Sequence, residues 1–282
     1  MDNSPIDLSG LSEPAKALIE KVAEAVGGLA KPWQLRRVAR AQADAAVIGA
    51  KAQIEIDDLQ RRALQRFVTE EGMKQANIES ITAQAIPLLD EKAASKDIDT
   101  DWIVHFFDRG RLISDEDMQK LWASLLAGQA NAPGSFSKQT INTVADFERS
   151  DAELFQALCR FMWRGADGHL ALIYDYKNEI YANLGITFNS LQHLEALGLL
   201  RFGADTSYFL HGQNETFRLA YFGKVFSLRT PNKSPPYSLD TGTVTLTRAG
   251  AELANVCIGE PVPDYIEHTL GMWRLRWIEL SA

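Results

Sequence analysis

The chain has 282 residues, of which 46% are hydrophobic and 23% charged, so it is long enough to bury the cores of two domains. It carries 37 acidic against 29 basic side chains, a formal net charge of -8. That balance excludes a generally basic nucleic-acid-binding protein, so any contact with nucleic acid has to be local. The apolar fraction also excludes a disordered or low-complexity chain.

The first residues, MDNSPIDLSGLSEP, contain neither the basic nor the apolar segment of a secretion signal, and we therefore expect a cytoplasmic protein. No run approaches the roughly 18 uninterrupted apolar residues of a spanning helix, so no membrane span is expected. The two cysteines, Cys159 and Cys257, lie far apart in the sequence and inside apolar stretches. They predict neither a disulfide framework nor a CxxC metal site, and we expect two small buried hydrophobic side chains.

After a short helix from Pro14 to Val26, one long helix is predicted between Pro32 and Pro87, with a pair of shorter helices as the alternative. This interval contains no proline, only two glycines, and many residues that favour helix. Apolar side chains recur along it at spacings of three and four, which places them on one stripe. Alanine dominates the stripe and lets another helix approach closely, so we predict a helical hairpin or an intermolecular bundle. The predicted oligomer interface consists of Val38, Ala41, Ala45, Ile48, Ala52, Ile56 and Leu59.

Residues 97–165 are predicted to form a helical core domain. Trp102 and Phe106 share a face of one helix, for which Thr100 or Asp101 is the expected cap, and Trp122 lies on a second helix that Ser114 caps with Asp117. The acidic run DIDTD lacks the glycine and the distal glutamate of a calcium loop, so helix capping is expected there instead. Helix is predicted to continue to about residue 163.

The pattern of predicted secondary structure changes after residue 165. A strand LALIYDY, a helix capped by Thr187, several short strands and the helix LTRAGAELANVC follow in the order of a winged-helix unit. The final WRLRWIEL alternates, so it is expected either to close the sheet as a strand or to cap the helical region. The predicted fold is therefore mainly α, with a long alanine-rich helix followed by a small α+β winged-helix-like unit. Its predicted regions are 1–96 for oligomerisation, 97–165 for the helical core and 166–282 for the winged-helix-like domain.

Two basic segments are candidates for contact with nucleic acid or an acidic partner. The candidate recognition helix, TFNSLQHLEALG, contains no Arg or Lys, although Asn189, Gln192 and His193 could contact bases. Phosphate contacts would then depend on the excess of basic residues in the C-terminal region. A strand face exposed to solvent explains that excess equally well. The candidate contact residues are Arg36, Arg37 and Arg40 on a helix face, which could also meet lipid headgroups or nearby Glu side chains, and Arg201, Arg218 and Lys224 in the C-terminal region.

The motifs of catalysis are missing from the sequence. It contains no GxSxG, no HExxH, no Walker A loop and no GxGxxG after a strand. We therefore predict no catalytic residues, no metal site and no cofactor, and a non-enzymatic protein.

Three stretches, KPWQLRRVARAQA, EEGMKQANIESITAQA and LISDEDMQKLWASLLAG with its PGSFS loop, resemble the uncharacterised bacterial domain-of-unknown-function 2806 family. The resemblance covers the chain from about Leu18 to Phe161. The N-terminal half is also similar to alpha-type abortive-infection proteins, which implies a setting in bacterial defence against phage. Neither family supplies catalytic residues.

Taken together, these patterns favour an oligomerising interaction or regulatory protein, expected to be a homo-oligomer with a protein partner. One alternative is a regulator that binds DNA through the winged-helix-like unit. The other is an abortive-infection effector that acts on membranes through its amphipathic N-terminal helices.

Overall fold

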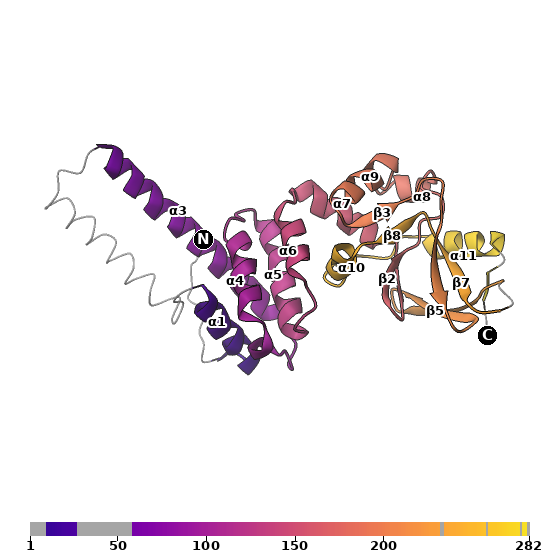
Figure 1. The fold of residues 1–282 in the computed structure, drawn as a ribbon, viewed down its shortest axis with the longest axis horizontal. Helices are drawn as coiled ribbons and strands as arrows, with labels where there is room; N and C mark the ends of the chain where they lie inside the picture. The colour runs from indigo at the N-terminus through magenta and orange to yellow at the C-terminus, as the bar shows by residue number, and fades with distance from the viewer. Residues whose placement is uncertain (1–9, 27–57, 232–233, 258, 277, 281–282) are drawn as a thin grey trace. The chain divides into compact units, whose positions relative to one another are not determined.

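A computed structural model describes residues 10–26, 58–231, 234–257, 259–276 and 278–280 of the chain. Its internal contacts divide the chain into two compact units, Met1–Ile141 and Asn142–Ala282 (Figure 1). The three regions predicted from the sequence remain predictions about domain organisation.

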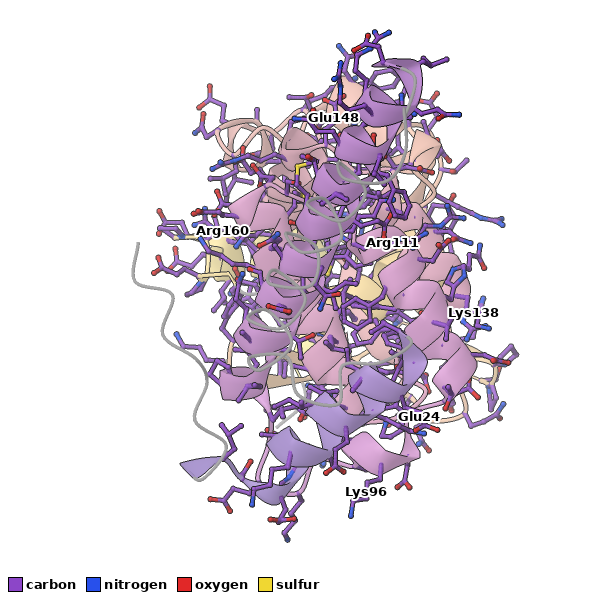
Figure 2. The ribbon with its side chains drawn as sticks, turned by 90° about the vertical axis from the view of Figure 1, so that its left-hand side faces the viewer. Glu24, Lys96, Arg111, Lys138, Glu148 and Arg160 are labelled. Atoms are coloured by element: carbon purple, nitrogen blue, oxygen red, sulfur yellow. The ribbon has the colours of Figure 1, made fainter. Side chains whose placement is uncertain are left out.

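Unit 1 is helical in all the regular structure that is described for it. Helix α1 contacts α4 and the 3-10 turn η3, while α3 lies along α5 and also contacts α4 (Figure 1). In Figure 2, Glu24 of α1 and Lys96 of η3 lie at the same end of the unit. The elements are α1 (Glu13–Ala25), α3 (Asp58–Ala85), η2 (Ile86–Leu88), η3 (Ser95–Asp97), α4 (Thr100–Gly110), α5 (Glu116–Asn131) and the start of α6 (Lys138–Ala145).

The described half of the predicted long helix is confirmed. Helix α3 runs without a break through Gly72 and ends at Ala85, and Pro87 falls in the 3-10 turn η2 that follows. Proline ends the helix because it has no N–H to donate and its ring crowds the preceding turn.

The predicted caps of α4 and α5 are each wrong by one residue. Asp99, not Thr100 or Asp101, caps α4, and its carboxylate accepts a hydrogen bond from the backbone N–H of Trp102 at 2.8 Å. Asp115, not Ser114, caps α5 by accepting from the backbone N–H of Met118 at 2.9 Å. In both cases an aspartate carboxylate is in position to reach the free N–H groups of the first turn.

The core of unit 1 is aromatic, as the helical periodicity predicts. The ring of Phe106 stacks on Trp102 with 5.0 Å between centroids and tilts against Trp122 at 4.9 Å. All three side chains are buried. The indole nitrogen of Trp102 also donates to the carbonyl of Phe136 at 2.7 Å, which fixes the loop before α6.

A buried amide fastens the C-terminal half of α3 to α5. Gln119 Nε2 donates to Asn77 Oδ1 at 3.1 Å and to the carbonyl of Ile113 at 2.8 Å. Its Oε1 accepts from Ser80 Oγ at 2.7 Å. Since buried polar groups are costly unless they are paired, this network selects one alignment of the two helices.

Unit 2 mixes helices and strands, so helix predominates in the chain but the fold is α+β. Its described elements follow the end of α6 in this order: α7 (Arg149–Cys159), β1 (Met162–Gly165), β2 (Gly168–Ala171), α8 (Glu179–Ala182), α9 (Phe188–Ala196), β3 (Leu200–Phe202), β4 (Tyr208–Gly212), β5 (Thr216–Tyr221), β6 (Lys224–Arg229), β7 (Tyr237–Gly242), β8 (Val244–Leu246), α10 (Arg248–Ala254), α11 (Tyr265–Leu275) and β9 (Glu279–Leu280).

The largest sheet is antiparallel, with strand order β2-β1-β5-β6-β9. One face packs against α11, where Trp163 of β1 meets Trp273 with 5.1 Å between ring centroids. Leu219, Tyr221 and Leu228 are buried on the same face. Two smaller sheets pair β3 with β8 and β4 with β7, and an isolated bridge joins Ile173 to Gly242.

One prediction about this unit is wrong and another holds only in part. The helix expected to reach residue 163 ends at Cys159, and β1 begins at Met162, because Trp163 is needed in the sheet core. The final segment closes the sheet only with Glu279–Leu280, which pairs with β6, since α11 continues to Leu275. Tyr265, Thr269 and Trp273 are all buried at a spacing of four, which is the helical period.

Candidate interaction surfaces

The first four turns of α3 project no side chain into a core. Every residue from Asp58 to Gly72 is exposed, whereas burial begins in the second half of the helix with Asn77 and Ile78. The exposed half nevertheless carries large apolar side chains, with exposed fractions of 63% for Leu59 and 60% for Phe67. Leu64, Val68 and Met73 are also exposed.

Leu59, Leu64, Phe67 and Val68 lie within one half of the circumference of α3. Leu59, Ala63 and Phe67 follow at intervals of four, and Leu64 and Val68 form the adjacent row. The helix also carries ion pairs within itself, between Arg61 and Asp58, Arg62 and Asp58, Arg66 and Glu70, and Lys74 and Glu71. This half of α3 is therefore amphipathic but, within the described residues, has no apolar partner.

Of the predicted oligomer interface, Leu59 lies on this exposed surface. The other six predicted interface residues, Val38, Ala41, Ala45, Ile48, Ala52 and Ile56, lie outside the described residues. Sequence periodicity did not indicate that the exposed region extends to Met73, although Leu64 and Val68 are visible there as a second apolar row.

A second surface is the outer face of the five-stranded sheet. Arg164 on β1 pairs in register with Ala220 on β5, so Arg218, two residues earlier, is its diagonal neighbour on the same face. Such neighbours have Cα atoms roughly 7–8 Å apart. His169 on β2 lies opposite Arg164, and burial, followed by the charge of Arg164, lowers the pKa of its imidazole.

Both arginines are exposed. Arg229 on β6 is paired with Glu215 at 2.8 Å, whereas no ion pair of Arg164 or Arg218 is found within the described part of the chain. Like charges held side by side on a sheet repel one another, so this face is arranged to favour an anionic ligand.

The structure does not gather the predicted basic residues into one wing. Arg201 is exposed on β3 in the small β3–β8 sheet, while Arg218 and Lys224 belong to the five-stranded sheet. Arg164, the neighbour of Arg218, was not predicted as a contact residue, because it falls in the glycine-containing segment RGADGH, where a break and not a strand is expected. Arg36, Arg37 and Arg40 lie outside the described residues.

Helix α9 presents little that could hold a phosphate backbone. Asn189 and Gln192 are exposed, as predicted, but Nε2 of His193 is engaged by Asp151 Oδ1 of α7 at 2.6 Å. Asp151 is itself buried and closes the capping box of α7. His193 therefore links α9 to α7, and its Nε2 atom is occupied by this hydrogen bond.

The two cysteines, distant in sequence, are neighbours in the fold. The thiol of Cys159 makes a side-chain hydrogen bond with that of Cys257, and burial, with that contact, raises the pKa of Cys159. No sequence motif predicts that these two residues are neighbours, because their proximity depends on how α7 packs against the segment after α10.

Within the described residues no group of three or more His, Cys, Asp or Glu side chains is placed to hold a metal ion. Among the helices described, none combines the length and the apolar character needed to cross a membrane.

These features define a two-unit α+β protein with an exposed amphipathic helix and a basic sheet face. The family model described as "Protein of unknown function (DUF2806)" matches residues 61–269, and the chain belongs to that family. No curated protein and no solved structure matches the chain.

Proposed function

We propose that the protein is a non-enzymatic, cytoplasmic interaction protein that self-associates through its long N-terminal helix. The observation that carries this proposal is the cluster of Leu59, Leu64, Phe67 and Val68 on the exposed half of α3. Fully burying one such side chain is worth about 1.5–3 kcal/mol, so four or more in one interface supply a substantial driving force for association.

The length of the surface supports a helix as the partner. Apolar residues at intervals of three and four over several turns fit the matching face of another helix, as in a bundle or coiled coil. A second copy of the same helix provides such a face, and its charged side can remain in water.

The test is the mass of the full chain in solution, measured by light scattering over a range of protein concentrations. The double variant Leu59→Glu with Phe67→Glu is expected to lower the mass to that of one chain while circular dichroism remains helical. The matched control, Gln65→Glu with Thr69→Glu, adds the same number of charges on the other side of α3 and is expected to leave the oligomer intact. An unchanged mass in the first variant would contradict the proposed interface.

We further propose that this assembly acts in bacterial defence against phage; this setting rests on the resemblance that the N-terminal sequence bears to alpha-type abortive-infection proteins, and no curated match supports it. Phage plating efficiency on a bacterium that expresses the protein tests this setting. Protection should be lost in the Leu59→Glu, Phe67→Glu variant and kept in the Gln65→Glu, Thr69→Glu control. Equal plating with and without the protein, over a panel of phages, would argue against it.

A second candidate function is binding of nucleic acid by unit 2. The order α7, β2, α8, α9, β3 and β8, with the bridge from Ile173 to Gly242, is compatible with a winged-helix-like unit that carries additional strands. Arg164 and Arg218, for which no ion pair is found among the described residues, favour phosphate contact on the five-stranded sheet.

Duplex and single-stranded DNA titrations at two salt concentrations distinguish the two arginine placements. If the sheet face binds phosphate, Arg164→Gln with Arg218→Gln weakens binding and reduces its salt dependence, whereas Arg201→Gln has little effect. Binding that responds only to Arg201→Gln would assign the contact to β3.

A further inference from the structure

Cys159 and Cys257 form a thiol pair in unit 2. Cys159 is the last residue of α7 and is buried, whereas Cys257 lies three residues after the end of α10 and is half-buried. The Cys257 side chain lies close enough to the Cys159 thiol to raise the pKa of that thiol.

Several contacts outside the pair keep the two segments together. Arg160, labelled in Figure 2, follows Cys159 directly, and its Nε donates to the carbonyl of Glu260 at 3.0 Å. A Cβ atom at Gly259 would lie 3.0 Å from the Arg160 side chain, so the backbone passes close to it.

A tyrosine hydroxyl adds a second link. Tyr221 OH donates to the carbonyl of Arg160 at 2.8 Å and accepts from the backbone N–H of Val262 at 2.8 Å. The chain that follows Cys257 is therefore tied to the end of α7 at more than one point. The fold therefore holds the two cysteine-bearing segments together.

The two thiols differ in reactivity. Burial raises the pKa of the Cys159 thiol, which keeps it protonated and slow to react on its own. Cys257 is the more accessible of the two and is the sulfur that a small oxidant meets first.

We propose that Cys159 and Cys257 are a reversible oxidation site, at which a peroxide-class oxidant converts the thiol pair into an intramolecular disulfide. Disulfides formed in reducing compartments are transient and serve redox sensing. The site goes beyond the proposed self-association and does not depend on it.

The chemistry balances with one molecule of hydrogen peroxide. The Cys257 thiol gives up its proton and its sulfur attacks one peroxide oxygen; the O–O bond breaks, water is released, and Cys257 becomes a sulfenic acid. Cys159 then attacks that sulfur as its own proton leaves, the S–O bond breaks, the S–S bond forms, and a second water departs. The two sulfurs together lose two electrons, the peroxide gains them, and a dithiol reductant reverses the change.

The disulfide would join the end of α7 to the segment after α10 and enclose β1 to β8 between them. A bond that closes so long a loop restricts the unfolded chain strongly, so oxidation is expected to raise the melting temperature of unit 2 by several degrees.

The test treats the full chain with hydrogen peroxide, blocks remaining thiols with N-ethylmaleimide and measures intact mass and cross-linked peptides. We expect both thiols to be lost together, at a rate independent of protein concentration. One linked peptide pair should contain Cys159 and Cys257. Dithiothreitol should restore both thiols and the original melting temperature.

Single variants separate the two roles. In Cys159→Ala, Cys257 should accumulate as a sulfenic acid that dimedone traps, because its resolving thiol is missing. In Cys257→Ser, Cys159 should stay unreacted under the same conditions. The proposal is overturned if oxidised wild-type protein keeps two blockable thiols, forms only bonds between chains, or oxidises Cys257 beyond sulfenic acid without joining Cys159.

Discussion

The two core tryptophans of unit 1 differ in a single hydrogen bond. Trp102 Nε1 donates to the carbonyl of Phe136, whereas Trp122 Nε1 is buried without a partner among the described residues. Replacing each by phenylalanine removes a similar volume, but only Trp102→Phe leaves a buried carbonyl unpaired. We expect Trp102→Phe to lower the free energy of unfolding by about 1–3 kcal/mol more than Trp122→Phe. Urea denaturation of both variants measures the difference, and equal losses would mean that the hydrogen bond contributes little.

His268 makes stability depend on pH. Burial lowers the pKa of its imidazole, with Asp175 acting in the opposite direction. Its Nε2 is buried next to the ring of Tyr181 and has no hydrogen-bond partner in the described part of the chain. Near the ordinary His value of 6.5 the unfolded chain therefore binds more protons than the folded one. The free energy of unfolding should fall as pH drops from about 7.5 to 5.5.

In His268→Leu this fall should be shallower than in the wild type, as measured by urea denaturation across the pH series. His211, exposed on β4, is the control position, and His211→Leu is expected to leave the slope unchanged. A wild-type slope retained in His268→Leu would show that the proton uptake occurs elsewhere.

At the scale of elements, two helical glycines should respond in opposite ways to alanine. Gly72 lies on exposed α3 with open space where a Cβ would stand, so Gly72→Ala should stabilise the protein by about 0.5–1 kcal/mol. At Gly250 in α10 a Cβ would overlap the carbonyl of Leu199, so Gly250→Ala should lower the melting temperature. Thermal unfolding of the pair tests both signs, and a loss of stability in Gly72→Ala would mean that this glycine is needed where it stands.

The elements also show what local sequence can and cannot predict. The helices around Trp102, Trp122 and Leu191 follow from apolar periodicity, because each buries one face in a core formed close by in the chain. Strand β1 was missed because Met162 and Trp163 continue the helical pattern of α7, and only pairing with β2 and β5 decides their conformation. The last segment was also misjudged, because WRLRWIEL alternates with the period of a strand, whereas the burial of Tyr265, Thr269 and Trp273 at the helical spacing continues α11 to Leu275.

The candidate sites likewise divide into features that local sequence predicts and features that depend on the fold. Leu59, a member of the predicted apolar stripe, is exposed. Its place in the stripe could be read from the sequence, because the stripe is defined by spacing within one helix. The Arg164–Arg218 pair and the Cys159–Cys257 pair join residues more than fifty positions apart, so they depend on strand register and on packing between elements. No spacing rule in a single sequence carries that information.

At the scale of the whole molecule, α3 combines a fixed half and an exposed half in one continuous helix. The fixed half is held to α5 by the Gln119 network, while the half from Asp58 to Met73 has its apolar side chains in water in a single chain. Helical turns without tertiary contacts open readily, so their amide hydrogens exchange fast, whereas turns in a core are protected. Self-association should therefore protect the first half of α3 and leave the second half unchanged.

Hydrogen exchange followed by mass spectrometry tests this prediction across a dilution series. Peptides from residues 58–73 should exchange faster as the protein is diluted, and peptides from residues 77–85 should not respond. The Leu59→Glu, Phe67→Glu variant should show fast exchange of the first half at every concentration, whereas Gln65→Glu with Thr69→Glu should behave like the wild type. Since both variants carry the same added charge on the same helix, a shared response would point to electrostatic opening of α3 rather than to loss of an interface. Protection that is independent of concentration in all three proteins would mean that the apolar surface is covered within one chain.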